Sequence, residues 1–280
     1  MQYGTKSTGT MSDNLAVIMS VYAGDTADNV KLAVESILSQ TCGDFTFYIQ
    51  LDGPVDGQVE HYLDGLTDSR IIVRKRKTNL GLARSLNELL EIILPEGYEF
   101  IARMDADDMS DPKRFERQLL YMESHPDIDC AGCWAVEITA DGREYFRKRM
   151  PESHIDCFRM FRKRDCIIHP TAMFRGKYFQ KAGLYETDTF YGEDTMMWAN
   201  GLASGCRLGN VPEFLYRFRI DAQFFDRRRG WSYAKGILEL RHRVNRMLGY
   251  GFVGDCYALA YAVFKMLPVS VLKILYRKLR

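Results

Sequence analysis

Short apolar runs alternate with segments of helical periodicity through the first hundred residues of the chain. The first run, residues 15–21, is continuous and partly β-branched, as in a strand buried on both faces of a sheet. Later strands are predicted at residues 45–51, 71–74 and 100–104, and helices between them at residues 30–38, 58–66 and 81–93. Alternation at this pitch predicts an α/β fold with a parallel, doubly wound sheet.

The remaining chain is less regular and ends in a helical, cationic tail. A helix is predicted at 115–124, a strand at 130–138 and a basic loop at 143–149. The 280 residues, 46% of them hydrophobic, suffice for one large domain with a smaller appendage. The predicted divisions are a disordered leader, a main α/β domain in two halves, and a basic amphipathic tail, at residues 1–11, 12–225 (12–110 and 111–225) and 226–280.

Charge and hydropathy limit the partners of the chain. The 38 basic and 37 acidic residues nearly cancel, which argues against nucleic acid as a partner. The longest apolar stretch of the tail, residues 252–274, is interrupted by Asp255, Lys265 and Pro268, so it falls short of a membrane span.

The tail has two interpretations. Its apolar side chains could meet a membrane surface while its cations meet anionic lipid heads. Alternatively, the helix packs on the main domain with its lysines in solvent. The apolar set is Tyr257, Leu259, Tyr261, Phe264, Leu267, Leu272 and Leu275, and the cationic set is Lys265, Lys273, Arg277, Lys278 and Arg280.

Seven cysteines occur at irregular spacing in a sequence without a secretory signal, which predicts reduced thiols and a cytoplasmic protein. Cys130 and Cys133 form a C-x-x-C pair, but no second pair or histidine pair completes a zinc site. Buried strand thiols are therefore favoured over redox or metal chemistry.

Polar residues follow the carboxyl ends of several predicted strands. Sheets of this kind bind their ligands beyond these ends. The residues are Ser20, Tyr22, Asp52, Asn79, Gly81, Asp105, Asp107 and Asp108. Three carboxylates within four positions repel one another unless a cation offsets their charge, and Mg²⁺ or Mn²⁺ prefers such oxygen ligands. The competing interpretation, in which Asp108 and Asp111 cap the next helix, requires only one of them.

Two further positions are candidates for chemistry. Asp194 follows Glu193 at the head of a predicted helix, where an ionised carboxylate is stabilised and can act as a general base. Plain helix capping by this pair is the alternative. His169, held extended by Pro170, is a candidate metal or phosphate ligand, or else a structural histidine.

An ordered series of motifs resembles glycosyltransferase family 2, the inverting enzymes of GT-A fold. The series consists of LAVIMSVY (15–22), SILSQT (36–41), Asp52-Gly53, NLGLARSLN (79–87), RMDADD (103–108), and Glu193-Asp194 with Trp198. Later features, including HPTAMF (169–174), resemble the bacterial enzymes that build amylovoran-type exopolysaccharide and O-antigen repeat units.

This resemblance implies a GT-A fold, Rossmann-like, with a mostly parallel sheet flanked by helices and a C-terminal helical extension. It implies that Ser20, Tyr22 and Asp52 hold the nucleobase and ribose, with Asp52 on the uracil imide. It implies further that Asp105 reaches the ribose, Asp107 holds the metal on the diphosphate with support from Asp108, and Asp194 is the base.

The implied reaction is the transfer of one hexose from a UDP-sugar, with UDP-galactose and UDP-glucose favoured. The acceptor would be an oligosaccharide or a lipid-linked repeat-unit precursor, used in the cytoplasm or at the inner face of the cytoplasmic membrane. The Gln-x-x-Arg-Trp pattern of processive synthases is missing, which favours transfer of a single sugar. The alternatives are a nucleotidyltransferase, which usually has a glycine-rich phosphate loop not found here, and a non-catalytic sugar-nucleotide-binding protein.

Overall fold

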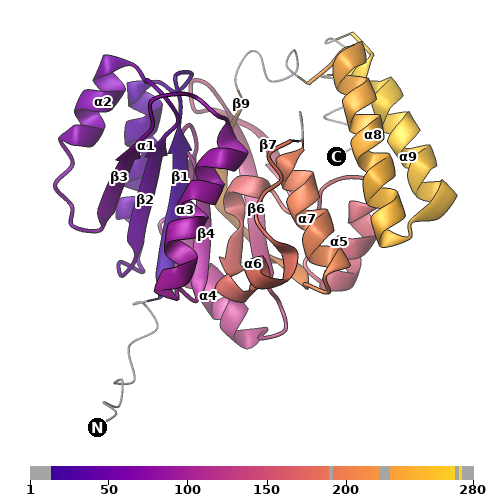
Figure 1. Cartoon of the computed structure of the whole chain (residues 1–280), viewed down its shortest axis with the longest axis horizontal. Helices are drawn as coiled ribbons and strands as arrows, with labels where there is room; N and C mark the ends of the chain where they lie inside the picture. The colour runs from indigo at the N-terminus through magenta and orange to yellow at the C-terminus, as the bar shows by residue number, and fades with distance from the viewer. Residues whose placement is uncertain (1–13, 189–191, 221–227, 269–270, 273–280) are drawn as a thin grey trace, which may run out of the picture.

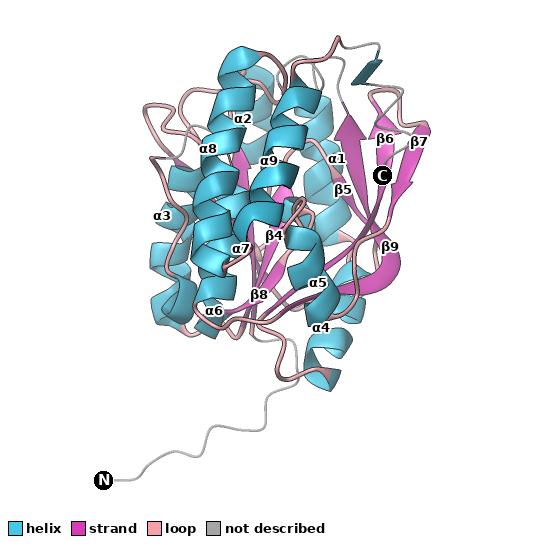
Figure 2. Cartoon of the chain, turned by 90° about the vertical axis from the view of Figure 1, so that its right-hand side faces the viewer, coloured by secondary structure: helices cyan, strands magenta, loops and turns pink. Residues whose placement is uncertain are grey.

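The computed structural model describes residues 14–188, 192–220, 228–268 and 271–272, which form a twisted mixed sheet between layers of helices (Figures 1 and 2). The predicted disordered leader lies outside the described residues. The strands are β1 (Leu15–Val21), β2 (Thr46–Leu51), β3 (Ile71–Lys75), β4 (Phe100–Asp105), β5 (Met109–Ser110), β6 (Cys130–Thr139), β7 (Glu144–Lys148), β8 (Met173–Arg175) and β9 (Leu208–Ile220). The helices are α1 (Ala27–Leu38), α2 (Gly57–Asp64), α3 (Leu82–Glu96), α4 (Arg114–Ser124), α5 (His154–Phe161), the 3₁₀ turn η1 (His169–Thr171), α6 (Gly176–Ala182), α7 (Glu193–Ala203), α8 (Trp231–Leu248) and α9 (Gly251–Lys265).

The first half of the chain forms the parallel part of the sheet, in the order β3-β2-β1-β4. The strands lie within a residue or two of the positions predicted from their apolar runs. Beyond β4 the order continues β8-β6-β9-β5, where only the β6 and β9 pair is parallel. The predicted α/β class and the mostly parallel sheet flanked by helices are confirmed.

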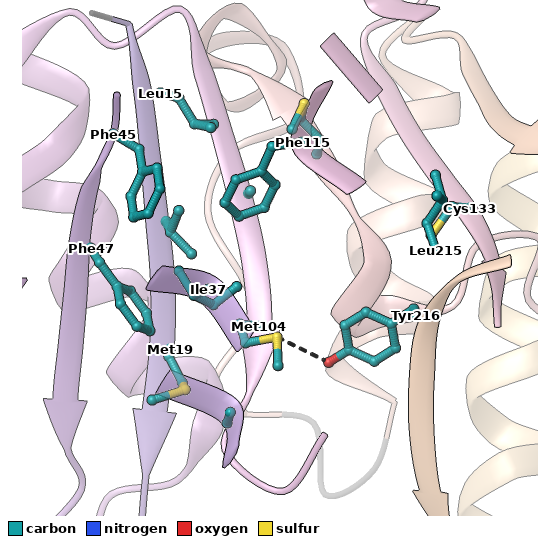
Figure 3. Packing of buried hydrophobic residues seen from close by; sticks show 14 of the residues in the cluster. Leu15, Met19, Ile37, Phe45, Phe47, Met104, Phe115, Cys133, Leu215 and Tyr216 are labelled. Carbon is teal, nitrogen blue, oxygen red and sulfur yellow. Dashed lines mark hydrogen bonds between the residues drawn. The ribbon is translucent and has the colours of Figure 1, made fainter. Parts of the chain in front are cut away.

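Alternate residues of β1 enter two different cores. Leu15, Val17 and Met19 pack with α1, α2 and α4 on one face of the sheet. Ala16 and Ile18 pack with α3 and α5 to α8 on the other face. Figure 3 shows the first core, in which the Tyr216 hydroxyl also reaches the Met104 sulfur. Burial of β1 on both faces explains why its sequence is apolar throughout.

The prediction of a basic loop at residues 143–149 is wrong. Residues 144–148 form β7, an antiparallel partner of β6 at the margin of the sheet. Two cations of this segment lie over aromatic rings: Arg149 lies 5.3 Å from the Trp134 ring centroid, and Arg147 lies 5.1 Å from that of Phe214. Cys130 and Cys133 are buried in β6, as the strand interpretation predicts, and burial raises the pKa of both thiols.

The described part of the tail is an antiparallel pair of helices, α8 and α9, at the side of the molecule farthest from β3 (Figure 1). α8 packs on α7 through Ile237 and Leu240, and α9 packs on α8. None of the described helices combines the length and apolarity needed to cross a bilayer. The helical extension is thus confirmed over its described residues, whereas Lys273, Leu275, Arg277, Lys278 and Arg280 lie outside them.

Candidate active site

The carboxyl ends of β1, β2 and β4 bring together residues that are far apart in the chain. In the parallel ladders, Ser20 is paired with Asp105 and Val21 with Leu51. Asp52 directly follows Leu51, so Ser20, Asp52 and Asp105 share one edge of the sheet. This is the edge at which open α/β sheets bind ligands.

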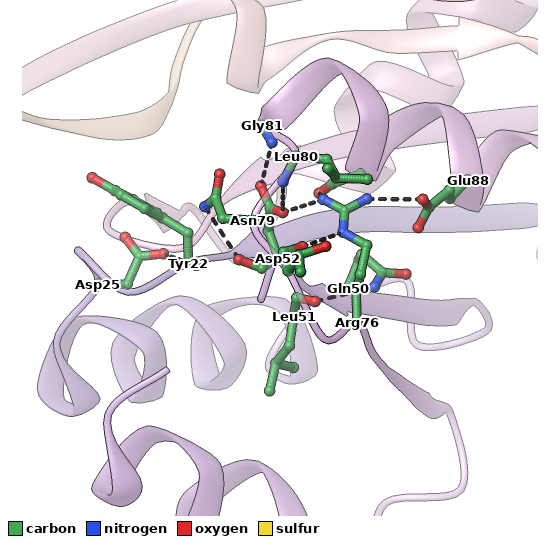
Figure 4. Close-up of polar contacts among 12 residues, drawn as sticks. Tyr22, Asp25, Gln50, Leu51, Asp52, Arg76, Asn79, Leu80, Gly81 and Glu88 are labelled. Carbon is green, nitrogen blue, oxygen red and sulfur yellow. Dashed lines mark hydrogen bonds and ion pairs between the residues drawn. The ribbon is translucent and has the colours of Figure 1, made fainter. Parts of the chain in front are cut away.

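Asp52 fixes the loop that enters α3 (Figure 4). Its carboxylate accepts the amides of Leu80 and Gly81 at 2.8 and 2.9 Å, and Asn79 Nδ2 donates to its carbonyl oxygen at 3.2 Å. The guanidinium of Arg76 forms an ion pair with the same buried carboxylate and another with Glu88. Asp52, Asn79 and Gly81 are therefore one structural unit, while the contact of Asp52 with uracil stays a prediction. Arg76 was not singled out from the sequence, although it follows a strand end like the other members.

Tyr22 and Asp25 form the turn after β1. The Tyr22 amide donates to Asp25 Oδ2 at 2.9 Å, and the Tyr22 ring is exposed beside Asn79 (Figure 4). The pKa of Asp25 is raised to about 7, chiefly by burial and further by the carboxylates of Asp107 and Asp105. Asp25 is therefore a fourth carboxyl near the acidic cluster, and its position after a strand end was the one sequence signal for it.

Asp105, Asp107 and Asp108 form an acidic cluster in which one ligand atom from each lies within 4.8 Å of the others. Arg219, on β9, holds this cluster in place. Its amide donates to Asp108 Oδ1 at 2.6 Å, and its Nε donates to the Asp107 carbonyl oxygen at 2.8 Å. Buried Arg103 donates to Asp105 Oδ1 at 2.6 Å. Neither arginine was given a role from the sequence.

The electrostatics of the acidic cluster fit a divalent cation. The pKa of Asp107 is raised to about 6, first by burial and then by the charge of Asp105. Burial and the other two carboxylates also raise the pKa of Asp108, against the lowering effect of the Arg219 amide and the Tyr216 hydroxyl. Three oxygen donors that repel one another are the ligand set that Mg²⁺ and Mn²⁺ prefer. Helix capping does not account for Asp108, because the residue before α4 is Lys113 and Asp108 bonds to β9 instead.

Asp194 lies in the first turn of α7, as predicted, where Gly192 is the N-cap and makes no side-chain cap bond. The pKa of Asp194 is raised to about 7 by burial first, and then by the charges of Asp165 and Glu193. Asp165 accepts Thr195 Oγ1 at 2.9 Å and the buried Arg241 of α8 at 2.7 Å. A carboxyl with a pKa near neutrality suits a general base. Asp165 and Arg241 were missed because their contacts join distant segments.

His169 is buried on the side of β4 that carries Arg103. Its Nε2 shares a hydrogen bond of 2.9 Å with the Tyr185 hydroxyl, and its ring meets Trp198 edge to face at 5.8 Å. Burial, and then the charge of Arg103, hold the pKa of His169 well below its usual range. The structure does not bring His169 into the acidic cluster. Its environment is the one expected of a structural histidine, and a role as metal ligand stays a prediction.

Tyr185 relates the acidic cluster to α7. Its backbone is held by Asn87 of α3 through two hydrogen bonds of 2.8 and 2.9 Å. Burial raises the pKa of its hydroxyl, Arg103 lowers it, and Asp194 raises it. Its hydroxyl shares a hydrogen bond with His169, whose ring packs against Trp198 of α7, and the turn η1 that holds His169 packs on β4, where Arg103 is bonded to Asp105. The two predicted centres of chemistry therefore belong to one region of the molecule.

Known proteins are similar to this chain in sequence over most of its length. The chain is 30% identical over 265 residues to the amylovoran biosynthesis glycosyltransferase AmsE of Erwinia amylovora, covering 94% of this chain and 98% of that protein. It is 25% identical to the UDP-Gal:alpha-D-GlcNAc-diphosphoundecaprenol beta-1,3-galactosyltransferase of Escherichia coli, covering 96% and 98% of the two chains.

Solved structures share the fold at low sequence identity. The crystal structure of S. aureus TarS residues 1–349 in complex with UDP-GlcNAc matches with a TM-score of 0.64 at 13% identity, covering 91% of this chain and 76% of that one. The mannosyltransferase PcManGT from Pyrobaculum calidifontis, in complex with GDP-Man and Mn²⁺, matches with a TM-score of 0.54 at 17% identity, covering 95% and 80%. The fold is GT-A. The sequence profile described as glycosyl transferase family 2 matches residues 16–183, and the chain belongs to this family of glycosyltransferases.

Proposed function

We propose that this enzyme transfers a single hexose from a UDP-sugar, either UDP-galactose or UDP-glucose, to a precursor of a polysaccharide repeat unit. The observation that carries the proposal is the acidic cluster at the end of β4, which shares one region with Asp194 on α7. The first could hold a diphosphate through a metal, and the second could remove a proton. Membership of the family disfavours a nucleotidyltransferase.

The names of the relatives support the choice of donor and acceptor. The protein of Escherichia coli is named for UDP-Gal and for an acceptor carried on diphosphoundecaprenol, and that of Erwinia amylovora for amylovoran biosynthesis. On this basis we infer a polyprenyl-diphosphate-linked acceptor and action at the cytoplasmic side of the membrane. The chain lacks the sequence pattern of processive synthases, which agrees with transfer of one sugar.

The donor would occupy the common edge of β1, β2 and β4. Ser20, Tyr22 and Asp52 would hold the nucleobase and ribose, and Asn79 and Gly81 would shape the wall beside them. Asp107 and Asp108 would hold Mn²⁺ or Mg²⁺, and Asp105 would face the ribose. The metal would neutralise the charge that develops on the departing diphosphate.

Asp194 would act as the general base. It would accept the proton of the acceptor hydroxyl while the hydroxyl oxygen attacks the anomeric carbon from the face opposite the diphosphate. As the new carbon–oxygen bond forms, the bond to the diphosphate breaks and its electron pair leaves with UDP. A single displacement inverts the anomeric configuration, so an α-linked donor would give a β-linked product.

A donor panel tests this assignment. With Mn²⁺ present, the purified protein should release UDP slowly from one preferred UDP-hexose and gain thermal stability with UDP, because ligands that bind the folded state stabilise it. GDP-mannose serves as the control donor, because its nucleobase differs from that of the UDP-sugars. Release of GDP without release of UDP would overturn the choice of nucleotide, and no release or stabilisation with any donor would favour a non-catalytic protein.

The pH dependence of transfer should follow the ionisation of Asp194. Its pKa is raised to about 7, so below that pH the carboxyl carries its proton and cannot accept another. Values of kcat/KM should therefore fall about tenfold per pH unit on the acid side. Asp165 and Glu193 raise this pKa, whereas Arg228 lowers it. Asp165→Asn keeps an oxygen for Thr195 and Arg241 but removes a charge, and it should move the acid limb to lower pH. If the acid limb of the pH profile does not move in Asp165→Asn, the profile does not report the ionisation of Asp194.

A further inference from the structure

The outward side of α9 is apolar along its whole length. Gly254, Ala258 and Ala262 are buried, so the opposite side of the helix is left exposed. The large side chains there are Phe252, Val253, Leu259, Val263 and Met266, with Phe252 82% and Leu259 56% exposed. We call these five residues the α9 stripe. Every residue of α9 in the exposed class is apolar, glycine or cysteine, which is unusual for a helix at the edge of a soluble domain.

The α9 stripe is not the surface predicted from the sequence. Tyr261, Phe264, Leu267 and Leu272 are partly or fully buried against the body of the protein, and of the described apolar set only Leu259 faces fully outward. Lys265 lies over the rings of Tyr233, Tyr261 and Phe264 at 5.0 to 6.0 Å. The predicted apolar surface is therefore wrong for these four residues, because periodicity alone does not show which apolar side chains pack inward.

A basic pocket adjoins this helix. Phe158, Arg159, Arg162, Lys163 and Tyr250 line an open pocket of about 430 Å³ where the end of α5 meets the start of α9. Arg162 and Lys163 lie 5.7 and 5.0 Å from the ring of Tyr257, which belongs to α9. The cations therefore lie on the flank of the α9 stripe.

The basic pocket carries a net positive charge. No carboxylate is among its lining residues, and Arg162 Nε is buried without a hydrogen bond to any described acceptor. On α5, Asp156 contacts Arg159 at 3.3 Å in an exposed pair, and on α9, Asp255 faces α8 through His242 and Asn245. Asp156 offsets the charge of Arg159, so Arg162 and Lys163 are the cations of the pocket that form no ion pair with a described carboxylate.

We propose that the α9 stripe lies in the interfacial region of an anionic bilayer and that the basic pocket receives a phosphate of a lipid headgroup. An apolar helix face flanked by cations is suited to such a surface, since it combines apolar burial with attraction to anionic lipid. A second copy of the chain fits less well. A symmetric contact through the α9 stripe would bring two basic pockets into one interface, where their charges repel. The proposal does not depend on which sugar nucleotide the enzyme uses.

Vesicle flotation of the full-length protein at low salt tests this surface. Wild type should float with vesicles of phosphatidylcholine mixed with phosphatidylglycerol and remain unbound with phosphatidylcholine alone. Lys163→Glu and Leu259→Asp should each weaken binding to the anionic vesicles by about tenfold. The matched controls are Lys31→Glu and Leu32→Asp, at exposed positions on α1, and they should bind as wild type does.

Cys256 offers a second readout, since it lies within the exposed face of α9 and is the one exposed cysteine of the seven. A polarity-sensitive dye on Cys256, in a Cys42→Ser background, should shift to the blue with anionic vesicles. Donor hydrolysis without vesicles should be the same in Leu259→Asp and wild type, so failure of the surface is distinct from failure of the active site. No binding to anionic vesicles, equal binding by all variants, or a dye shift that follows protein concentration without lipid would overturn the proposal, the last in favour of a dimer.

Discussion

Asp194→Asn is expected to lower kcat for sugar transfer about a thousandfold, while the affinity for UDP changes little. The substitution removes the proton acceptor, and a positioned general base contributes on the order of 10² to 10⁴ in rate. Its shape and local bonding are kept, because asparagine Oδ1 can still accept the Thr195 amide that now donates to Asp194 at 2.7 Å. Steady-state kinetics with the preferred donor, together with UDP titration by calorimetry, separate the loss in kcat from any loss in binding.

Glu193→Gln is the matched control for this substitution. Glu193 is the adjacent carboxylate in the same first turn of α7 and contributes to the raised pKa of Asp194. The variant should retain transfer within a few-fold and move the acid limb of its pH profile to lower pH. If Glu193→Gln loses as much activity as Asp194→Asn, the base is not Asp194 alone. If Asp194→Asn weakens UDP binding in proportion, Asp194 belongs to the donor site.

Of the strands predicted from the sequence, β1, β2, β4 and β6 are largely buried, whereas β3 is partly exposed and was predicted from its short apolar run. β1 lies between β2 and β4 with cores on either side, so its apolar run had one interpretation. β7 was missed because it is a marginal strand, none of whose five residues is buried, and its sequence EYFRK has neither an apolar run nor a regular alternation. A basic segment of this kind is predicted as a loop, because the sequence does not show which strand it pairs with.

In the active site, groupings of residues that are close in sequence could be predicted, whereas contacts between distant residues could not. Asp105, Asp107 and Asp108 are close in sequence and follow a strand, so their grouping could be predicted. The residues that hold them could not, because Arg219 lies 111 positions from Asp108 along the chain. Arg241 lies within the predicted basic tail, residues 226–280, but it is buried and paired with Asp165. The sequence gives the charge of a side chain, but it does not give the partner that neutralises that charge.

Asp107→Ala should abolish most of the metal-dependent affinity for UDP, by about a hundredfold, because a metal ion on a diphosphate supplies several kcal/mol of stabilisation. The same variant should be more stable than wild type when metal-free. The pKa of Asp107 is raised to about 6 in the folded protein, so its ionisation above that pH opposes folding, and the alanine variant lacks this cost. Thermal unfolding with EDTA and with Mn²⁺ measures both effects.

Asp111→Ala is the control for Asp107→Ala. It distinguishes the loss of a metal ligand from the loss of a neighbouring carboxylate that does not bind the metal. Asp111 lies in the same loop but outside the acidic cluster, and its Oδ1 accepts the Lys113 amide at 2.9 Å. It should keep the Mn²⁺-dependent increase in Tm and in UDP affinity, with a small loss of stability from the missing hydrogen bond. The two variants should thus change metal-free stability in opposite directions. If Asp107→Ala keeps the full Mn²⁺ response, Asp107 is not a metal ligand; if it loses the response but is destabilised without metal, the carboxylate holds the loop as well as the ion.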